Sequence, residues 1–169
     1  MKKSILISLL SFFLTACSGS SFSMNTTNAA LPPEPDRTAN NAILAGIDSD
    51  GDGVRDDVQR LVFRSYTSTK KRTLSLALAK EVRKIYATPP TTRAEARAIA
   101  DAENRVSDCI YSRREMDFNS RGGLNEQIVA AHTDTRERMK TYRAYNSLLH
   151  GELFYLHDSD PDICKGILP

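Results

Sequence analysis

The sequence predicts an all-α protein, a small bundle of about four main helices preceded by an acidic loop. Three observations predict this fold class. After residue 54, apolar residues recur three and four positions apart, as one face of a helix requires. Proline and glycine pairs separate these helical segments. No segment has the alternation of β-branched residues that would indicate a strand.

Residues 1–16 have the composition of a targeting segment. Lys2 and Lys3 form a basic start, and the apolar run that follows is too short to span a bilayer as a mature helix. The motif Leu14-Thr15-Ala16-Cys17 resembles the lipobox of bacterial lipoproteins. This resemblance implies cleavage before Cys17 and a lipid on its sulfur that anchors the chain in a membrane. The alternative is an ordinary secretory signal with a chance cysteine.

Ser18, rather than an aspartate, follows the lipidated cysteine. By resemblance to enteric sorting rules, this implies the periplasmic side of the outer membrane. Residues 17–40 are predicted to be a lipidated, flexible tether, because Ser, Asn, Thr and Pro dominate and few large apolar residues are available for burial. The folded domain is then predicted to span residues 41–169, which is enough chain for one modest core.

The charge of the chain gives no reason to expect a nucleic acid as partner. The formal net charge of the whole sequence is +2, and without the Lys2 and Lys3 charges it is zero. A balanced chain has no basic excess that would attract a polyanion.

The stretch from Asp48 to Gln59 is the one place where residue type and spacing together specify a chemistry. Carboxylates stand at loop positions 1, 3, 5 and 9, and Gly53 at position 6 permits a sharp reversal of the backbone. Because Ca²⁺ takes six to eight oxygen ligands, its predicted ligands are Asp48, Asp50, Asp52, Val54 through its carbonyl, Asp56 and Gln59. The alternative is a solvated turn in which Asp56 or Asp57 caps the following helix.

This loop resembles those of the EF-hand family and of its single-loop bacterial relatives, such as dockerin and thrombospondin type 3 loops. The loop and the helical segment after it also resemble those of uncharacterised bacterial lipoproteins. EF-hands place a bidentate glutamate at position 12, where this chain has Gln59, so the resemblance implies a weak affinity, about 10⁻⁴ to 10⁻³ M. Arg55 occupies position 8, where paired EF-hands carry an aliphatic residue. We therefore expect a single structural ion rather than a cooperative switch.

Four main helices are predicted after the start of the loop, over residues 54–66, 70–87, 92–114 and from 124 onward. Pro89-Pro90 ends the second helix, because proline lacks the backbone donor. Thr92 and Glu95 have the spacing of a capping box that begins the third.

The remaining segments of the domain are predicted from shorter patterns. Residues 41–47 are expected to form a turn or short helix with Ile43, Leu44 and Ile47 facing inward. Residues 117–123 are expected to be a loop, and the last helix is expected to kink or divide near Asn146 or Gly151.

Cys109 and Cys164 remain as an even pair once Cys17 carries lipid, and the envelope is an oxidising compartment. We predict a disulfide between them that contributes about 4 kcal/mol, since it closes a long loop. The alternative is a buried free thiol at Cys109.

His132, His150 and His157 match no metal-binding spacing. They are expected to be partly exposed helical residues, so they are not assigned to any site.

These observations predict a lipid-anchored module that binds Ca²⁺ and interacts with an unidentified protein or envelope component through a helix face. The alternative is an envelope hydrolase acting on a cell-wall or surface polymer, with calcium as a scaffold ion. No catalytic residue is assigned, since the chain lacks GxSxG, P-loop and GxGxxG motifs. A cleft lined by close carboxylates of raised pKa would favour the hydrolase, and an apolar groove would favour the interaction module.

Overall fold

The computed structural model of the chain describes residues 31–113, 123–155 and 160–168. Within these ranges the secondary structure is helical, without a β-strand, and the elements are α1 (Arg37–Ala42), α2 (Asp56–Ser65), α3 (Thr69–Ala87), α4 (Arg93–Arg113), α5 (Leu124–His132) and α6 (Arg136–Leu148). The prediction of an all-α bundle is confirmed.

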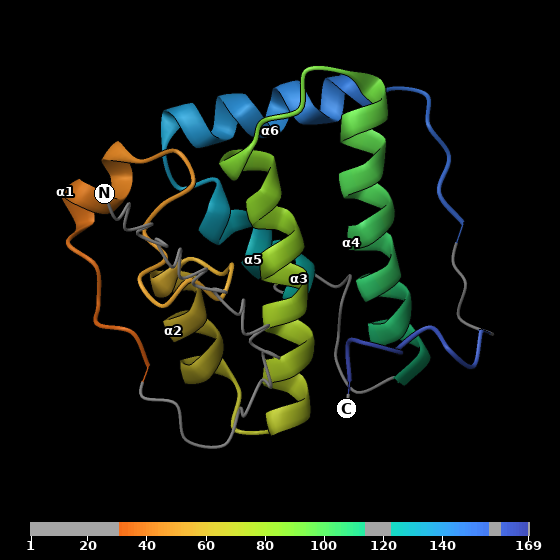
Figure 1. The fold of residues 1–169 in the computed structure, drawn as a ribbon, viewed down its shortest axis with the longest axis horizontal. Coiled ribbons are helices and arrows are strands. Elements are labelled where there is room, and N and C mark those ends of the chain that lie inside the picture. Colours follow the sequence, from red (N-terminus) through yellow and green to blue (C-terminus); the bar gives the residue numbers. More distant parts are fainter. Residues whose placement is uncertain (1–30, 114–122, 156–159, 169) are drawn as a thin grey trace, which may run out of the picture.

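Helix α3 lies at the centre of the bundle, with α2 on one side, α4 on the other and α6 crossing near its end (Figure 1). Its core residues recur at intervals of three and four positions, and each is at most 2% exposed: Leu74, Leu78, Val82 and Ile85. This periodicity keeps one side of α3 in the core along its whole length, as the sequence predicted. Helices α2, α4, α5 and α6 all pack against it.

The ends of the central helices are set by the predicted local signals. The N–H of Glu95 donates to the Thr92 hydroxyl at 3.2 Å, and the N–H of Thr92 donates to the Glu95 carboxylate at 3.1 Å. These two reciprocal bonds are the predicted capping box, which is therefore confirmed. The hydroxyl of Ser68 accepts from the N–H of Lys71 and caps α3 in a similar way.

The folded domain begins earlier in the chain than predicted. Residues 32–40 were assigned to the tether, but Asp36 caps α1 and Asn40 is only 3% exposed. Arg60 of α2 donates to the carbonyl of Pro32 at 2.8 Å and pairs with Glu34. The boundary at residue 41 is therefore wrong. Composition was misleading here because polar side chains and backbone carbonyls, rather than apolar residues, attach this segment to the domain.

The segment that leads into the acidic loop follows its prediction in part. Helix α1 ends at Ala42, and a turn follows in which the N–H of Gly46 donates to the carbonyl of Ile43 at 3.0 Å. Leu44 is partly buried against the core, whereas the side chain of Ile43 is 48% exposed and does not face inward.

The last predicted helix ends at Leu148, between the two predicted break positions Asn146 and Gly151. It also has a break that was not predicted, between α5 and α6. Helix α5 ends at His132 and α6 begins at Arg136, with the hydroxyl of Thr135 accepting from the N–H of Arg138 at 3.2 Å. Asp134, which lies between α5 and α6, forms ion pairs with two arginine side chains that are described below. The predicted loop at residues 117–123 lies outside the described residues except for Gly123.

The predicted disulfide between Cys109 and Cys164 is confirmed. Both residues are buried, at 0% and 4% exposed. Arg105 of α4 also donates to the carbonyl of Lys165 at 2.8 Å. The disulfide therefore joins residues 160–168 to α4 across a sequence separation of 55 residues.

The double substitution Cys109→Ala with Cys164→Ala is expected to lower the free energy of unfolding by about 3 to 4 kcal/mol, because the unfolded chain regains the freedom of a long loop. Urea denaturation of both proteins without reductant measures the difference. Wild-type protein in reductant serves as the control and should match the variant. Unchanged denaturation midpoints would show that the crosslink does not stabilise the domain.

Candidate metal centre

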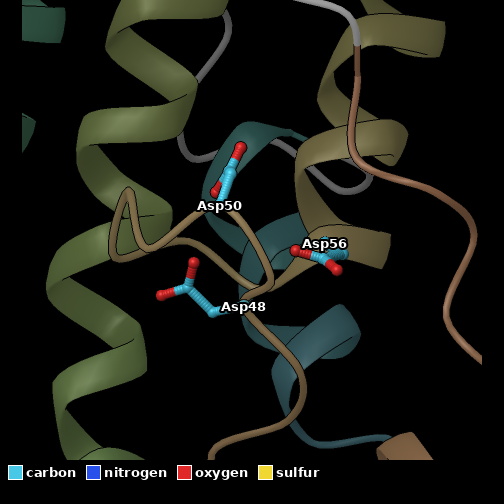
Figure 2. A group of neighbouring side chains, drawn as sticks. All are labelled: Asp48, Asp50 and Asp56. Carbon is cyan, nitrogen blue, oxygen red and sulfur yellow. The ribbon is translucent and has the colours of Figure 1, made fainter.

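Three of the predicted calcium ligands come together in the acidic loop. One carboxylate oxygen each from Asp48, Asp50 and Asp56 lies within 4.8 Å of the others. Figure 2 shows Asp48 and Asp50 extending from the loop and Asp56 from the first turn of α2. Oxygens that share a calcium ion at about 2.4 Å are no more than about 5 Å apart. The spacing of these carboxylates is thus compatible with a single ion.

Backbone N–H groups hold the loop carboxylates in place. The N–H of Gly53 donates to Asp48 at 3.1 Å, and the N–H of Ser49 donates to Asp56 at 2.9 Å. The N–H of Asp56 donates to the carbonyl of Ile47 at 2.9 Å, which closes the loop across its two ends. These bonds fix the backbone of the loop without using all the carboxylate oxygens.

Gly53 provides the backbone reversal that the sequence predicted. Its φ of 90° lies in the left-handed region, which favours glycine. A Cβ atom at this position would also lie 2.8 Å from Cε of Lys80 on α3. The turn therefore favours glycine at this position, and the side chain of Lys80 occupies the space beside it.

The other predicted ligands lie beside the three clustered carboxylates. Asp52 accepts from the N–H of Val54 at 2.7 Å and from Nε2 of Gln59 at 3.1 Å. Nε2 of Gln59 also lies 3.4 Å from a carboxylate oxygen of Asp50. The side chain of Val54 packs in the core, at 2% exposed.

Two buried oxygen atoms at the loop have no hydrogen-bond partner among the described residues. They are Oδ1 of Asp48 and Oε1 of Gln59. The residue Gln59 is only 8% exposed. An unsatisfied buried acceptor costs free energy that a bound cation would recover. The loop thus contains hydrogen-bond acceptors that no donor of the described residues satisfies.

Cations from α3 compensate only part of the negative charge. Arg83 approaches Asp48 at 3.3 Å, and Lys80 donates to the carbonyl of Asp52 at 2.8 Å. Burial raises the pKa of Asp52, and the carboxylates of Asp50 and Asp48 raise it further, although the Val54 N–H and the Lys80 ammonium oppose this. The net rise therefore reflects burial first and repulsion from the neighbouring carboxylates second.

Arg55 explains why the loop departs from the EF-hand pattern at position 8. Its side chain is buried and donates to Asp57 at 3.0 Å, to Asp134 at 3.0 Å and to the carbonyl of Ala131 at 2.7 Å. The carboxylate of Asp57 is therefore used by this arginine and is not available to an ion. A Cβ atom on Gly46 would lie 2.1 Å from Cδ of Arg55, so glycine is needed there as well.

A second buried arginine, Arg138 of α6, completes this arrangement. It donates to Asp134 at 2.7 Å and to the carbonyls of Asn40, Ile43 and Leu44 at 2.7 to 3.0 Å. Burial alone would raise the pKa of Asp134, but hydrogen bonds and positive charge from Arg138 and Arg55 hold it below its ordinary value. We refer to Arg55, Asp57, Asp134 and Arg138 as the arginine network.

The arginine network was not predicted from the sequence. The one available signal was Arg55, a charged residue at a loop position where an aliphatic side chain is usual. Arg138 gave no signal, because an arginine in an otherwise polar stretch of helix normally faces solvent.

The expectation of partly exposed histidines is wrong for His132, which is 1% exposed. Its Nδ1 donates to the carbonyl of Ile128 at 2.8 Å, and its ring stacks on Tyr86 with the centroids 5.8 Å apart. Burial, with a smaller effect of the Arg55 charge, lowers the pKa of His132 to about 4. His150 is exposed, and His157 lies outside the described residues.

No protein-family model matches the chain, and comparisons with curated proteins and with solved structures find no similar protein. In the described ranges, no helix combines the length and the apolar character needed to cross a membrane. The functional inference is therefore carried by the chemistry of the residues themselves.

The buried His132 is expected to make stability fall in acid. It stays neutral in the folded protein until about pH 4, whereas in the unfolded chain it takes up a proton near 6.5. Stability from this residue is therefore complete above pH 6.5 and is lost as the pH falls through 4. Relative to His132→Phe, the wild-type protein should lose about 3 kcal/mol over that interval, measured by urea denaturation across pH.

The matched control is His150→Gln, which changes an exposed histidine and should leave the pH profile of the wild-type protein unchanged. Parallel profiles for the wild type and His132→Phe would contradict the assignment of a neutral buried imidazole.

Proposed function

We propose that this protein is a lipid-anchored cell-envelope lipoprotein whose helical domain carries one structural calcium ion. The observation that carries the proposal is the cluster of Asp48, Asp50 and Asp56, with oxygens within 4.8 Å of one another. The unpartnered buried oxygen of Asp48 supports it independently, because it is an acceptor without a donor among the described residues.

In this proposal Asp48, Asp50 and Asp56 hold the ion, and Asp52, Gln59 and the carbonyl of Val54 complete its ligands. Gln59 is suited to the role although it carries no charge. Its Nε2 now contacts Asp50 and Asp52, and rotation of the amide exchanges the positions of its nitrogen and oxygen. The oxygen would then stand where the nitrogen does, facing the carboxylates.

The surroundings favour a structural ion over a switch. The loop is closed by backbone bonds, and Arg55 anchors it in the arginine network. A switch requires an element with two arrangements of similar free energy, whereas the buried arginine contacts favour one. The calcium ion would neutralise the clustered carboxylates and fix the angle between the loop and α2.

The biological role that fits these features is that of an interaction or structural module. The lipid on Cys17 would hold the domain at the periplasmic side of the outer membrane, with the residues between Cys17 and the folded domain serving as the tether. The partner is then an unidentified protein or envelope component that recognises a helix face. Nucleic acid is not expected as a partner, given the balanced charge.

Calcium is expected to raise the melting temperature of the purified protein. At about ten times the Kd, calcium adds about 1.4 kcal/mol, which corresponds to a shift of about 3 to 6 °C for a domain of this size. Melts in calcium and in chelator measure the shift. Asp50→Asn and Asp52→Ala should lose it, whereas Asp160→Asn, which changes an exposed acid in the C-terminal segment, should keep it. Equal melts with and without calcium for the wild type would remove the site.

A second candidate, the envelope hydrolase, is favoured by one observation. Glu103 of α4 lines a cavity, and burial raises its pKa to about 7, a value suited to a general acid. Its hydrogen-bond partner is the hydroxyl of Tyr145 at 3.1 Å rather than a second carboxylate. Hydrolases of polysaccharides use two carboxyl groups that flank the scissile bond, so this observation supports the hydrolase only in part.

Incubation of the purified protein with isolated cell-wall sacculi separates the two functions. The interaction module is expected to release no soluble fragments, with a known wall hydrolase as the positive control. Fragment release that the variant Glu103→Gln abolishes would instead establish the hydrolase.

A further inference from the structure

A cavity of about 400 Å³ lies among α3, α4, α5 and α6, away from the acidic loop. Leu78 and Val82 of α3 and Val129 of α5 provide apolar surface, whereas Glu103 of α4 and Tyr142 of α6 provide polar atoms. A volume of this size is in the range of small-molecule sites, which combine apolar walls with a few directed polar groups.

The segment after α6 forms a wall of this cavity and is attached to α4. Glu152 pairs with Arg93 at 3.2 Å and also with Arg97. The guanidinium of Arg97 lies over the ring of Phe154, 4.6 Å from its centroid. Phe154 and its neighbour Tyr155 line the cavity. The aromatic wall is thus held by contacts formed on its outer side.

Glu103 is the charged group that the cavity offers to a ligand. Its carboxylate accepts from the hydroxyl of Tyr145 at 3.1 Å, which orients it. Burial raises the pKa of Glu103 to about 7, and the Glu81 carboxylate adds to this rise. The hydrogen bond from Tyr145 and the positive charge of Lys84 oppose it. Lys84 itself pairs with Glu81. The carboxylate therefore lacks a direct ion pair among the described residues.

The chemical character of the lining selects one class of ligand. Its described residues include the carboxylic acid Glu103 and four aromatic rings but no lysine, arginine or histidine: Glu103, Tyr111, Tyr142, Phe154 and Tyr155. Asp108 also lines the cavity, but it has an interaction partner of its own. Acidic and aromatic groups together attract organic cations, through charge and through the negative faces of the rings. An anion would be repelled, and a hard metal ion would find apolar side chains in place of the oxygens it requires.

We propose that this cavity binds a small organic ammonium ion, whose charged end contacts the Glu103 carboxylate and whose carbon skeleton packs against Tyr142 and Phe154. The site is separate from the acidic loop, so it does not depend on calcium binding or on the proposed function. A bound cation favours the ionised form of Glu103. Binding near neutral pH therefore releases a proton, and affinity rises between pH 6 and pH 8.

Titration calorimetry of the purified protein with choline, tetramethylammonium and benzylamine tests the proposal. The neutral control is 3,3-dimethylbutan-1-ol, which has the shape of choline without its charge. We expect at least one ammonium probe to bind at millimolar or lower concentration and the neutral alcohol to bind at least about tenfold more weakly. The observed heat should also differ between buffers of different ionisation enthalpy, because a proton is released.

Glu103→Gln is the decisive variant, since its amide oxygen still accepts from Tyr145 and the fold is retained, which an unchanged circular dichroism spectrum checks. It should weaken ammonium binding at least about tenfold and remove the buffer dependence. Glu137→Gln, an exposed acid on α6 outside the cavity, is the matched control and should bind as the wild type does. Equal affinity for choline and its neutral analogue, unchanged binding by Glu103→Gln, or no binding by any ammonium probe would each overturn the proposal.

Discussion

Two buried guanidinium groups, those of Arg55 and Arg138, share the carboxylate of Asp134, and the arrangement of α1, the acidic loop and the connection between α5 and α6 depends on this contact. A buried charge is costly unless it is paired and its donors are satisfied. Here the remaining donors are taken up by Asp57 and by four backbone carbonyls, those of Asn40, Ile43, Leu44 and Ala131. Loss of either arginine would leave several of these acceptors unpaired. Helix α1, the acidic loop and the connection between α5 and α6 therefore stabilise one another.

The arginine network also determines which acidic residues are left for an ion. Asp57 and Asp134 are both paired with guanidinium groups. Asp48, Asp50 and Asp56 have carboxylate oxygens within 4.8 Å of one another, and Arg83 pairs with Asp48. This division gives the proposed calcium ion a frame that exists before it binds, so the ion would relieve repulsion between carboxylates rather than build the fold.

Helix α3 connects the two candidate sites while keeping them apart. Lys80 and Arg83 support the acidic loop, whereas Leu78 and Val82 form the floor of the cavity beside Glu103. Residues two positions apart on a helix point in nearly opposite directions. One helix therefore presents cations to the loop and apolar surface to the cavity, which allows the two sites to differ completely in chemistry.

The sequence by itself determined the features that depend on neighbouring residues. The core face of α3, the capping box of Thr92 and Glu95 and the position of Gly53 in the loop all follow from spacing along a few turns of chain. The disulfide was also predictable, because Cys109 and Cys164 are the two cysteines left once Cys17 is assigned to the predicted lipobox. In the candidate metal centre, the sequence identified all three clustered carboxylates, since they lie within one loop.

Features that depend on distant partners could be seen only in the assembled bundle. Arg138 contacts carbonyl groups of residues 40–44, which are 94 to 98 residues away in the chain, and Arg60 contacts Pro32 and Glu34. These contacts attach residues 32–40 to the domain, against the expectation from their composition. The burial of His132 and the isolation of Glu103 arise from how four helices meet. Helical periodicity specifies which face of each helix is apolar. It does not specify which polar residues at the margin of that face contact a charged group, a backbone carbonyl or a cavity formed by another helix. Those contacts depend on how the helices pack in the assembled bundle.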